Sequence, residues 1–231
     1  MALYSYIKKT DTRKKWGKKR SKKGKVFSLG LLLVGVLLLS TTIGPIVFFE
    51  LFYSPSTRDV APSVRAESVS FDLTDKDYTK ASVWFPKALS YKISEVGNEY
   101  TLSIPSVAID HAKVIMGGED LTQSLIQFTG PQPGNKGSPV IFGHSSLPIL
   151  YNPLNYKTIF TKLPTLKKGD VITLFSDAVN YTYEVSDLKV TTPDDLSVLS
   201  QDESQASLTL VTCIPPGTTL KRLVVTAKLT S

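Results

Sequence analysis

The chain has 231 residues, of which 42% are apolar and 10% are aromatic, so it has enough apolar material for the core of one domain and is not disordered throughout. The formal net charge is +7, but it is unevenly spread, because residues 1–25 hold eleven Lys or Arg and one Asp while the remaining 206 residues carry −3. The basic character belongs to a tail. A basic nucleic-acid surface over the folded part is therefore excluded, and we expect no nucleic-acid partner.

The basic tail is followed by an apolar segment. Val26 to Phe49 is a run of twenty-four residues without a charge. As a helix it would span roughly 36 Å, more than the roughly 30 Å of a bilayer core. We therefore predict a single transmembrane helix over residues 26–52, with residues 1–25 in the cytoplasm and the rest of the chain outside the cell membrane. A cleaved signal peptide is disfavoured, because its apolar core would be shorter and would end in small residues rather than in bulky ones such as Phe52.

Residues 53–97 are predicted to form a linker and an N-terminal extension of the domain that follows. Ser54–Ser70 is rich in Pro, Ser and charge, which is typical of a solvated linker. Phe71–Val96 is too aromatic for a pure linker, with Tyr78 and Trp84 among its residues. It is expected to form a short helix or a strand that packs on the domain, and the sequence leaves this choice open.

Residues 98–231 are predicted to form an all-β domain, because short strand-like runs alternate with turns rich in Gly and Pro. The runs are YTLSIPSV, AKVIM, SPVIFGH, DVITLFS, NYTYEVSDLKVT, ASLTLVTC and RLVVTAKL. Seven or eight strands at this spacing favour a barrel or a sandwich. The apolar spacing within Glu119–Phe128 predicts a helix, and Asp194–Leu199 a further helical turn.

The last two predicted strands carry the most reactive pair of side chains. Cys213, the only cysteine, ends one strand, and Arg222 begins the next after a Pro-Pro-Gly turn. A short hairpin would bring both residues to the same end of a sheet. A lone cysteine is often a buried structural residue. At a strand end before a tight turn, however, it is expected to face a cleft, where a cationic neighbour favours the thiolate.

The chain has two histidines that could serve as a base. His144 ends the run SPVIFGH after Gly143, which frees the backbone to turn. His111 lies in AIDHAKV and is interpreted as a surface or packing residue. His144 is therefore the preferred candidate.

Three segments resemble the sortase family, the membrane-anchored cysteine transpeptidases of bacterial cell surfaces. They are TLVTC at Thr209–Cys213 with Arg222 after it, SPVIFGHS at Ser138–Ser145, and a looser match that begins near EYTLSIPSVAID at Glu99. The resemblance implies a closed eight-stranded β-barrel. It also implies that His144, Cys213 and Arg222 are catalytic and that Thr212 contacts substrate. No sortase class is assigned.

The activity implied by the resemblance is acyl transfer in two steps. Cys213 would cleave an LPxTG-like C-terminal sorting signal of a secreted protein, and an amine of a cell-wall precursor or a pilin would resolve the thioester. Arg222 would stabilise the oxyanion, unless it is only a solvated charge at a strand edge. The apolar stretch Leu147–Leu154 could line the cleft and help to exclude water. A membrane-anchored cysteine protease and a non-enzymatic surface β-domain remain as alternatives.

No cofactor is expected. Two distant histidines and one cysteine do not form a zinc site. The acidic residues could in principle bind calcium, as in some sortases, but their spacing matches no calcium loop. The chain also lacks a Gly-rich phosphate loop.

Overall fold

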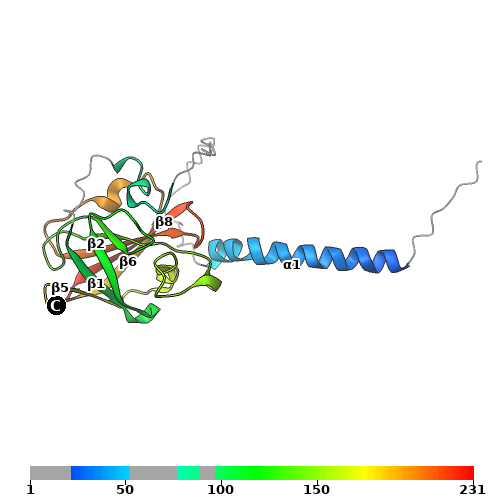
Figure 1. The fold of residues 1–231 in the computed structure, drawn as a ribbon, viewed down its shortest axis with the longest axis horizontal. Helices are drawn as coiled ribbons and strands as arrows, with labels where there is room; N and C mark the ends of the chain where they lie inside the picture. Colours follow the sequence, from blue (N-terminus) through cyan, green and yellow to red (C-terminus); the bar gives the residue numbers. More distant parts are fainter. Residues whose placement is uncertain (1–21, 53–76, 89–96) are drawn as a thin grey trace, which may run out of the picture. The chain divides into compact units, whose positions relative to one another are not determined.

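The computed structural model describes residues 22–52, 77–88 and 97–231. Helix α1 spans Lys22–Phe52 (Figure 1), and the side chains described at positions 27–40 are exposed. A helix therefore covers the segment predicted to span a membrane, while the spanning itself stays a prediction. Among the residues that the structure describes, no helix meets the combination of length and apolar character that crossing a bilayer requires. The predicted basic tail lies almost entirely outside these residues, and the predicted linker Ser54–Ser70 lies wholly outside them.

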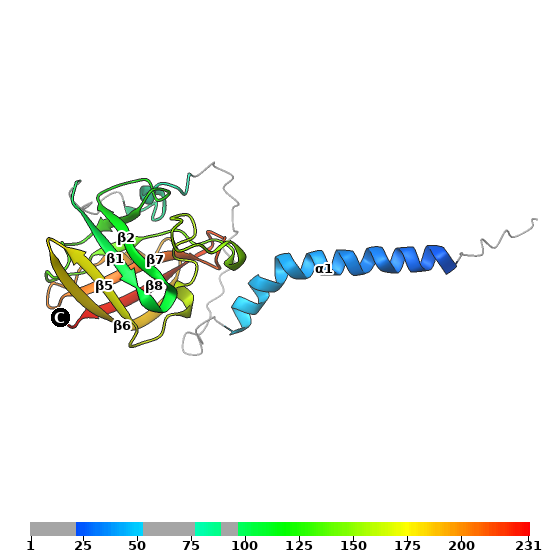
Figure 2. The same cartoon turned by 60° about the horizontal axis from the view of Figure 1, so that its bottom comes forward.

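The second compact unit of the chain contains a closed barrel, which confirms the prediction of eight strands (Figure 1). The strands are β1 (Glu99–Ile104), β2 (Ile109–Met116), β3 (Leu125–Thr129), β4 (Val140–Phe142), β5 (Val171–Ser176), β6 (Val179–Thr191), β7 (Ser207–Ile214) and β8 (Lys221–Leu229). Their order around the barrel is β1-β2-β3-β4-β7-β8-β6-β5, and Figure 2 shows β5, β6 and β8 in one wall. The pairs β2–β3 and β4–β7 are parallel, and the other six are antiparallel. Since β4 and β7 are parallel, their carboxyl ends meet at the same end of the barrel.

Two apolar cores lie on opposite faces of this barrel wall. Successive side chains of a strand point to opposite faces, so Leu210 joins the core inside the barrel while Val211 and Cys213 face outward. The outward-facing side chains form a second core, called here the outer cluster. Its buried members are Ala81, Trp84, Phe85, Ala88, Leu121, Ile126, Phe128, Val140, Phe142, Val198, Leu199, Val211, Cys213 and Val224. The barrel therefore has a wall that is buried on both faces at β3, β4, β7 and β8.

The outer cluster is covered by residues 77–88, called here the cover segment. It contains the 3-10 helix η1 (Ala81–Val83), so the short helix, rather than a strand, is the conformation of this part of the aromatic extension. Ala81 N donates to Glu119 O at 3.0 Å, and Leu121 N donates to Thr79 O at 2.9 Å. These bonds fix the cover segment to the turn before β3, and the Trp84 side chain is fully buried in the outer cluster.

The prediction of a helix over Glu119–Phe128 is wrong. Asp120 accepts hydrogen bonds from the backbone N and the hydroxyl of Thr122, at 2.8 and 2.6 Å, and this local bonding makes a turn. Strand β3 follows directly, with all five of its residues buried. A strand buried on both faces has a continuous apolar run, which periodicity alone does not distinguish from a buried helix.

The helical turn predicted at Asp194–Leu199 is present as the 3-10 helix η6 (Leu196–Leu199). Asp195 caps it by accepting a hydrogen bond of 3.1 Å from Ser197 N. The other 3-10 helices of the described barrel region are η3 (Pro105–Val107), η4 (Pro148–Leu150) and η5 (Leu163–Thr165).

Candidate active site

The hairpin of β7 and β8 places Cys213 directly opposite Arg222. The two residues are partners in the register of this antiparallel pair. The strands form because the sequence alternates β-branched and apolar residues, and they end because the Pro-Pro-Gly turn interrupts the ladder. Thr218 N closes this turn by donating to Pro215 O at 3.0 Å. The predicted juxtaposition of a thiol and a guanidinium at one sheet end is thus present.

His144 follows β4, the strand beside β7, at the position that corresponds to Cys213 on β7. Phe142 of β4 is in register with Val211 of β7, and Gly143 N donates to Val211 O at 3.2 Å. His144 and Cys213 are each two residues beyond that pair, and both extend from the outer face of the wall. Gly143 is required here because a Cβ atom would lie 2.5 Å from Phe160 Cδ2. The strand end therefore brings the imidazole to the thiol's side of the barrel.

Trp84 of the cover segment is the residue that sequence reasoning did not place in the site. Its ring centroid lies 5.5 Å from that of His144 and 5.4 Å from that of Phe142. The guanidinium carbon of Arg222 lies 5.4 Å from the same ring. Trp84 therefore contacts two of the three predicted catalytic side chains, and the only signal for it in the sequence was the aromatic content of the extension.

Arg222 is buried, with 1% of its surface exposed, so the alternative of a solvated strand-edge charge is excluded. Its Nη1 donates to the carbonyl oxygens of Thr219 and Lys221, at 3.0 and 3.2 Å, and its Nη2 to that of Trp84, at 3.1 Å. Its Nε is also buried but has no hydrogen-bond partner within the described structure. A buried donor without an acceptor is costly, and such groups point to a function. The Nε–H of the guanidinium is thus a donor without an acceptor in the described part of the chain.

Burial sets the protonation of the two reactive groups. Only 4% of Cys213 is exposed, because its thiol is packed in the outer cluster. The prediction that Cys213 faces a cleft is therefore wrong for this structure. Burial raises the pKa of the Cys213 thiol, and the positive charge of Arg222 offsets part of that rise. Burial also lowers the pKa of His144, with a further lowering by Lys157 and an opposing effect of Asp120. The neutral thiol and the neutral imidazole are therefore the favoured forms near pH 7.

Two hydroxyl groups tie β4 and β7 together beside the site. Ser145 Oγ donates to Cys213 O at 2.6 Å, and Thr212 Oγ1 donates to Gly143 O at 2.7 Å. Thr212 is fully buried and extends from the face opposite Cys213. Contact between Thr212 and substrate stays a prediction, while its observed role is to align the two strand ends.

The second histidine lies elsewhere on the barrel. His111 is on β2, with 72% of its side chain exposed and its Nδ1 2.6 Å from Asp110 Oδ1, which agrees with its interpretation as a surface residue. Within the described ranges, no three His, Cys, Asp or Glu side chains come close enough together to hold a metal ion.

The stretch Leu147–Leu154 differs from the expectation. Its large apolar side chains face solvent, with Ile149 and Leu154 exposed by 90% and 84%, so they do not line a cleft in this structure. Leu147 approaches the β7–β8 connection, where its Cδ2 would lie 3.2 Å from a Cβ atom at Gly217.

Comparison with known proteins agrees with this fold. The model of the sortase domain matches residues 102–230. Sortase A of Bacillus anthracis is 30% identical over 129 residues, which are 55% of this chain and 58% of that protein. Sortase D of Bacillus subtilis is 28% identical over 99 residues, or 42% of this chain and 44% of that one. The matches thus span about half the length of these two relatives.

Solved structures give the same result. Sortase C-1 of Actinomyces oris superimposes with a TM-score of 0.50 at 29% identity, covering 57% of this chain and 73% of that one. Sortase A of Corynebacterium diphtheriae gives a TM-score of 0.50 at 27% identity, covering 59% and 62%. The family model accounts for more than half of the chain, and the chain belongs to the sortase family.

Proposed function

We propose that this protein is a cysteine transpeptidase that acts on C-terminal sorting signals through a thioester at Cys213. The observation that supports this most is the direct pairing of Cys213 with Arg222, whose buried Nε has no acceptor. Membership of the sortase family and the position of His144 at the end of β4 support it independently. Cys213 and Arg222 are cross-strand partners, and His144 extends from the same face of the wall at the end of β4, an arrangement that supports acyl transfer.

The reaction begins with transfer of the thiol proton from Cys213 to His144. The sulfur then attacks the scissile carbonyl carbon, and the resulting oxyanion accepts a hydrogen bond from Arg222. His144 protonates the departing amine, which leaves the acyl group on Cys213 as a thioester. An amine of a cell-wall precursor or a pilin attacks that thioester, gives a proton back to His144 and releases the thiolate. Water in place of this amine would make the protein a protease.

The same proposal places the barrel outside a cell membrane. Val26 to Phe49 is uncharged, the basic residues 1–25 precede it, and the side chains described at positions 27–40 of α1 are mostly apolar and all exposed. Protease added to intact cells should cleave the barrel or the linker and spare the basic tail. Cleavage of the tail alone would overturn this orientation.

The transpeptidase proposal is tested with a labelled LPxTG peptide, with and without an added amine. The expected result is a cleaved peptide without the amine and a ligated one with it. His144→Ala should abolish both products, whereas His111→Ala is the matched control and should leave both intact. Cleavage without ligation for every amine would support the protease, and the absence of both products would support a non-enzymatic domain.

A further inference from the structure

The end of the barrel that carries the candidate site also carries exposed apolar side chains. Among the described residues of 97–231, eight large apolar side chains are exposed. Three of these, Val171, Phe175 and Val179, belong to β5 and β6. The other five, called here the apolar tip, are Leu147, Ile149, Leu150, Leu154 and Leu220.

The apolar tip is one surface built from two connections. Leu147 lies against Gly217 of the β7–β8 connection, which also carries Leu220. In Figures 1 and 2 the yellow-green η4 turn and the orange-red β7–β8 connection lie at the same end of the barrel. The tip begins three residues after His144, so it borders the candidate site.

The exposure of the tip is a fixed feature of the fold. Leu150 N donates to Leu147 O at 2.9 Å, and Leu154 N donates to Asn152 Oδ1 at 2.9 Å. The hydroxyl of the buried Thr158 closes the loop by donating to Asn152 O at 2.9 Å. These bonds hold the backbone of the loop, and its aliphatic side chains stay exposed to water at a free-energy cost.

Charge is segregated in the same part of the chain. Between Asp120 and Asp170 the sequence has five lysines and no acidic residue, whereas the rest of residues 97–231 has five Lys or Arg and twelve Asp or Glu. The five lysines are Lys136, Lys157, Lys162, Lys167 and Lys168. Lys157 and Lys162 are exposed and flank the tip, and Lys162 Nζ lies 4.2 Å from the centroid of the Tyr151 ring. The apolar tip is thus bordered by cations within an otherwise acidic domain.

We propose that the apolar tip inserts into the interfacial region of an anionic lipid bilayer. Protruding aliphatic side chains bordered by lysines and an aromatic ring are what binding to such an interface requires. A groove for an apolar peptide would enclose its side chains, whereas Ile149 and Leu154 are almost fully exposed. A second copy on a two-fold axis would bring the flanking lysines against each other. Docking of the tip turns the end of the barrel that carries the candidate site towards the lipid surface.

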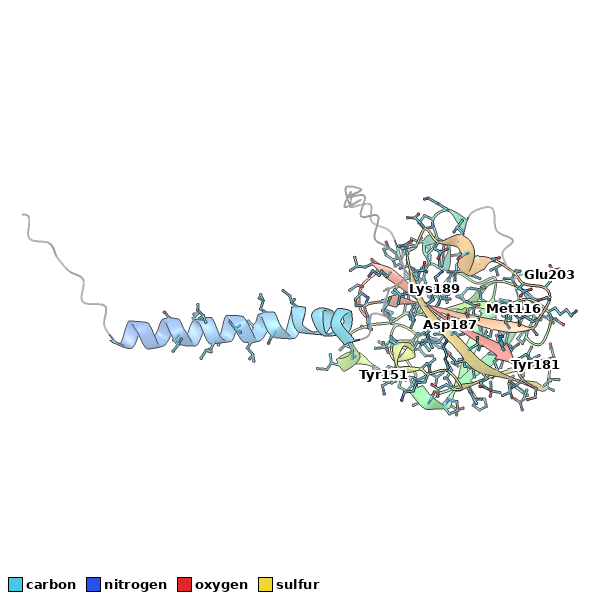
Figure 3. The ribbon with its side chains drawn as sticks, turned by 180° about the vertical axis from the view of Figure 1, so that it is seen from behind. Met116, Tyr151, Tyr181, Asp187, Lys189 and Glu203 are labelled. Carbon is cyan, nitrogen blue, oxygen red and sulfur yellow. The ribbon has the colours of Figure 1, made fainter. Side chains whose placement is uncertain are left out.

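The test compares reporters at the two ends of the barrel. Leu154→Cys carries an environment-sensitive fluorophore at the tip, and Val179→Cys carries the same fluorophore at the other end of the barrel. The last residue of β6, Thr191, pairs with Arg222 at the end that holds the site, so the first residue of β6, Val179, lies at the opposite end. Figure 3 shows Tyr151 and Tyr181 at these opposite ends. Both full chains carry Cys213→Ala, so the labelled cysteine is unique and the result does not depend on acyl transfer.

Both chains are reconstituted into vesicles of phosphatidylcholine with phosphatidylglycerol that carry nitroxide-labelled lipid. The fluorophore at position 154 should shift to the blue and be quenched about threefold more than that at position 179. Raising salt from about 0.1 to about 0.5 M, or omitting phosphatidylglycerol, should reduce the difference. Adding Ile149→Asp and Leu150→Asp should abolish it.

Equal quenching at the two positions would overturn the proposal and leave the transpeptidase proposal intact. A blue shift without vesicles that grows with protein concentration would also overturn it, because a second copy would then cover the tip.

Discussion

Arg222 Nη2 donates a hydrogen bond of 3.1 Å to the carbonyl oxygen of Trp84, a residue 138 positions earlier in the chain. The bond joins the cover segment to the start of β8, and the Trp84 ring also contacts His144. The cover segment thus fixes the guanidinium and packs beside the base candidate at the same time. Its contacts belong to the site as much as to the core.

Arg222→Lys should lower turnover of a sorting peptide by at least about 10-fold, or roughly 1.4 kcal/mol of barrier. Lysine keeps the charge but lacks the donor fork that reaches the carbonyl oxygens of Thr219 and Trp84 and that is proposed to reach the oxyanion. The measurement is kcat/KM for the peptide, with thermal unfolding as the check on folding. Unchanged turnover in a folded variant would remove Arg222 from the mechanism.

The pKa of His144 should respond with opposite signs to two charge substitutions. Lys157 lowers this pKa and Asp120 raises it, so Lys157→Gln should raise it and Asp120→Asn should lower it. NMR titration in a His111→Gln background follows the single remaining imidazole. The midpoint of the parent protein should lie below 6.5, the ordinary histidine value. Shifts of equal sign in the two variants would contradict the arrangement described.

Alkylation of Cys213 should accelerate only at high pH, because burial raises the pKa of the thiol. Arg222→Gln should move the midpoint still higher, since the lost positive charge no longer favours the thiolate. Iodoacetamide rates between neutral and alkaline pH give both midpoints. A midpoint that fell in Arg222→Gln would show that the guanidinium does not act on the thiol.

Trp84→Ala should destabilise the protein by about 3–5 kcal/mol and expose the thiol, because the ring is fully buried over the site. Alkylation at a fixed alkaline pH should be faster in this variant. Tyr183→Ala is the matched control, since it removes a buried aromatic ring from the core inside the barrel. Equal acceleration in both variants would mean that global unfolding, rather than loss of the cover, exposes Cys213.

The sequence predicted those parts of the site that depend on local patterns. The strand alternation around the Pro-Pro-Gly turn predicted that Cys213 and Arg222 lie at the same end of a sheet, and the Gly-His strand end predicted the location of His144. Each of these two features depends on residues that are close to one another in the sequence. The resemblance to the sortase family then predicted the closed barrel in which the two features lie on neighbouring strands.

The errors arose where tertiary contacts decide the structure. Strand β3 resembled a helix, because burial on both faces removes the period-two pattern. Trp84 was not assigned to the site, since its contacts with Arg222 cross 138 positions of sequence. The buried state of Cys213 follows from that same segment. The exposure of the apolar tip was also missed, because composition does not show which way a loop turns its side chains.

The most direct test of the thioester at Cys213 is intact-protein mass spectrometry of a reaction quenched with acid before any amine is added. The protein should gain the mass of the acyl fragment, and mapping should place this mass on the peptide that contains Cys213. Neutral hydroxylamine or an acceptor amine should remove it. Peptide cleavage with no adduct on Cys213, or with undiminished cleavage in Cys213→Ala, would contradict the proposed mechanism.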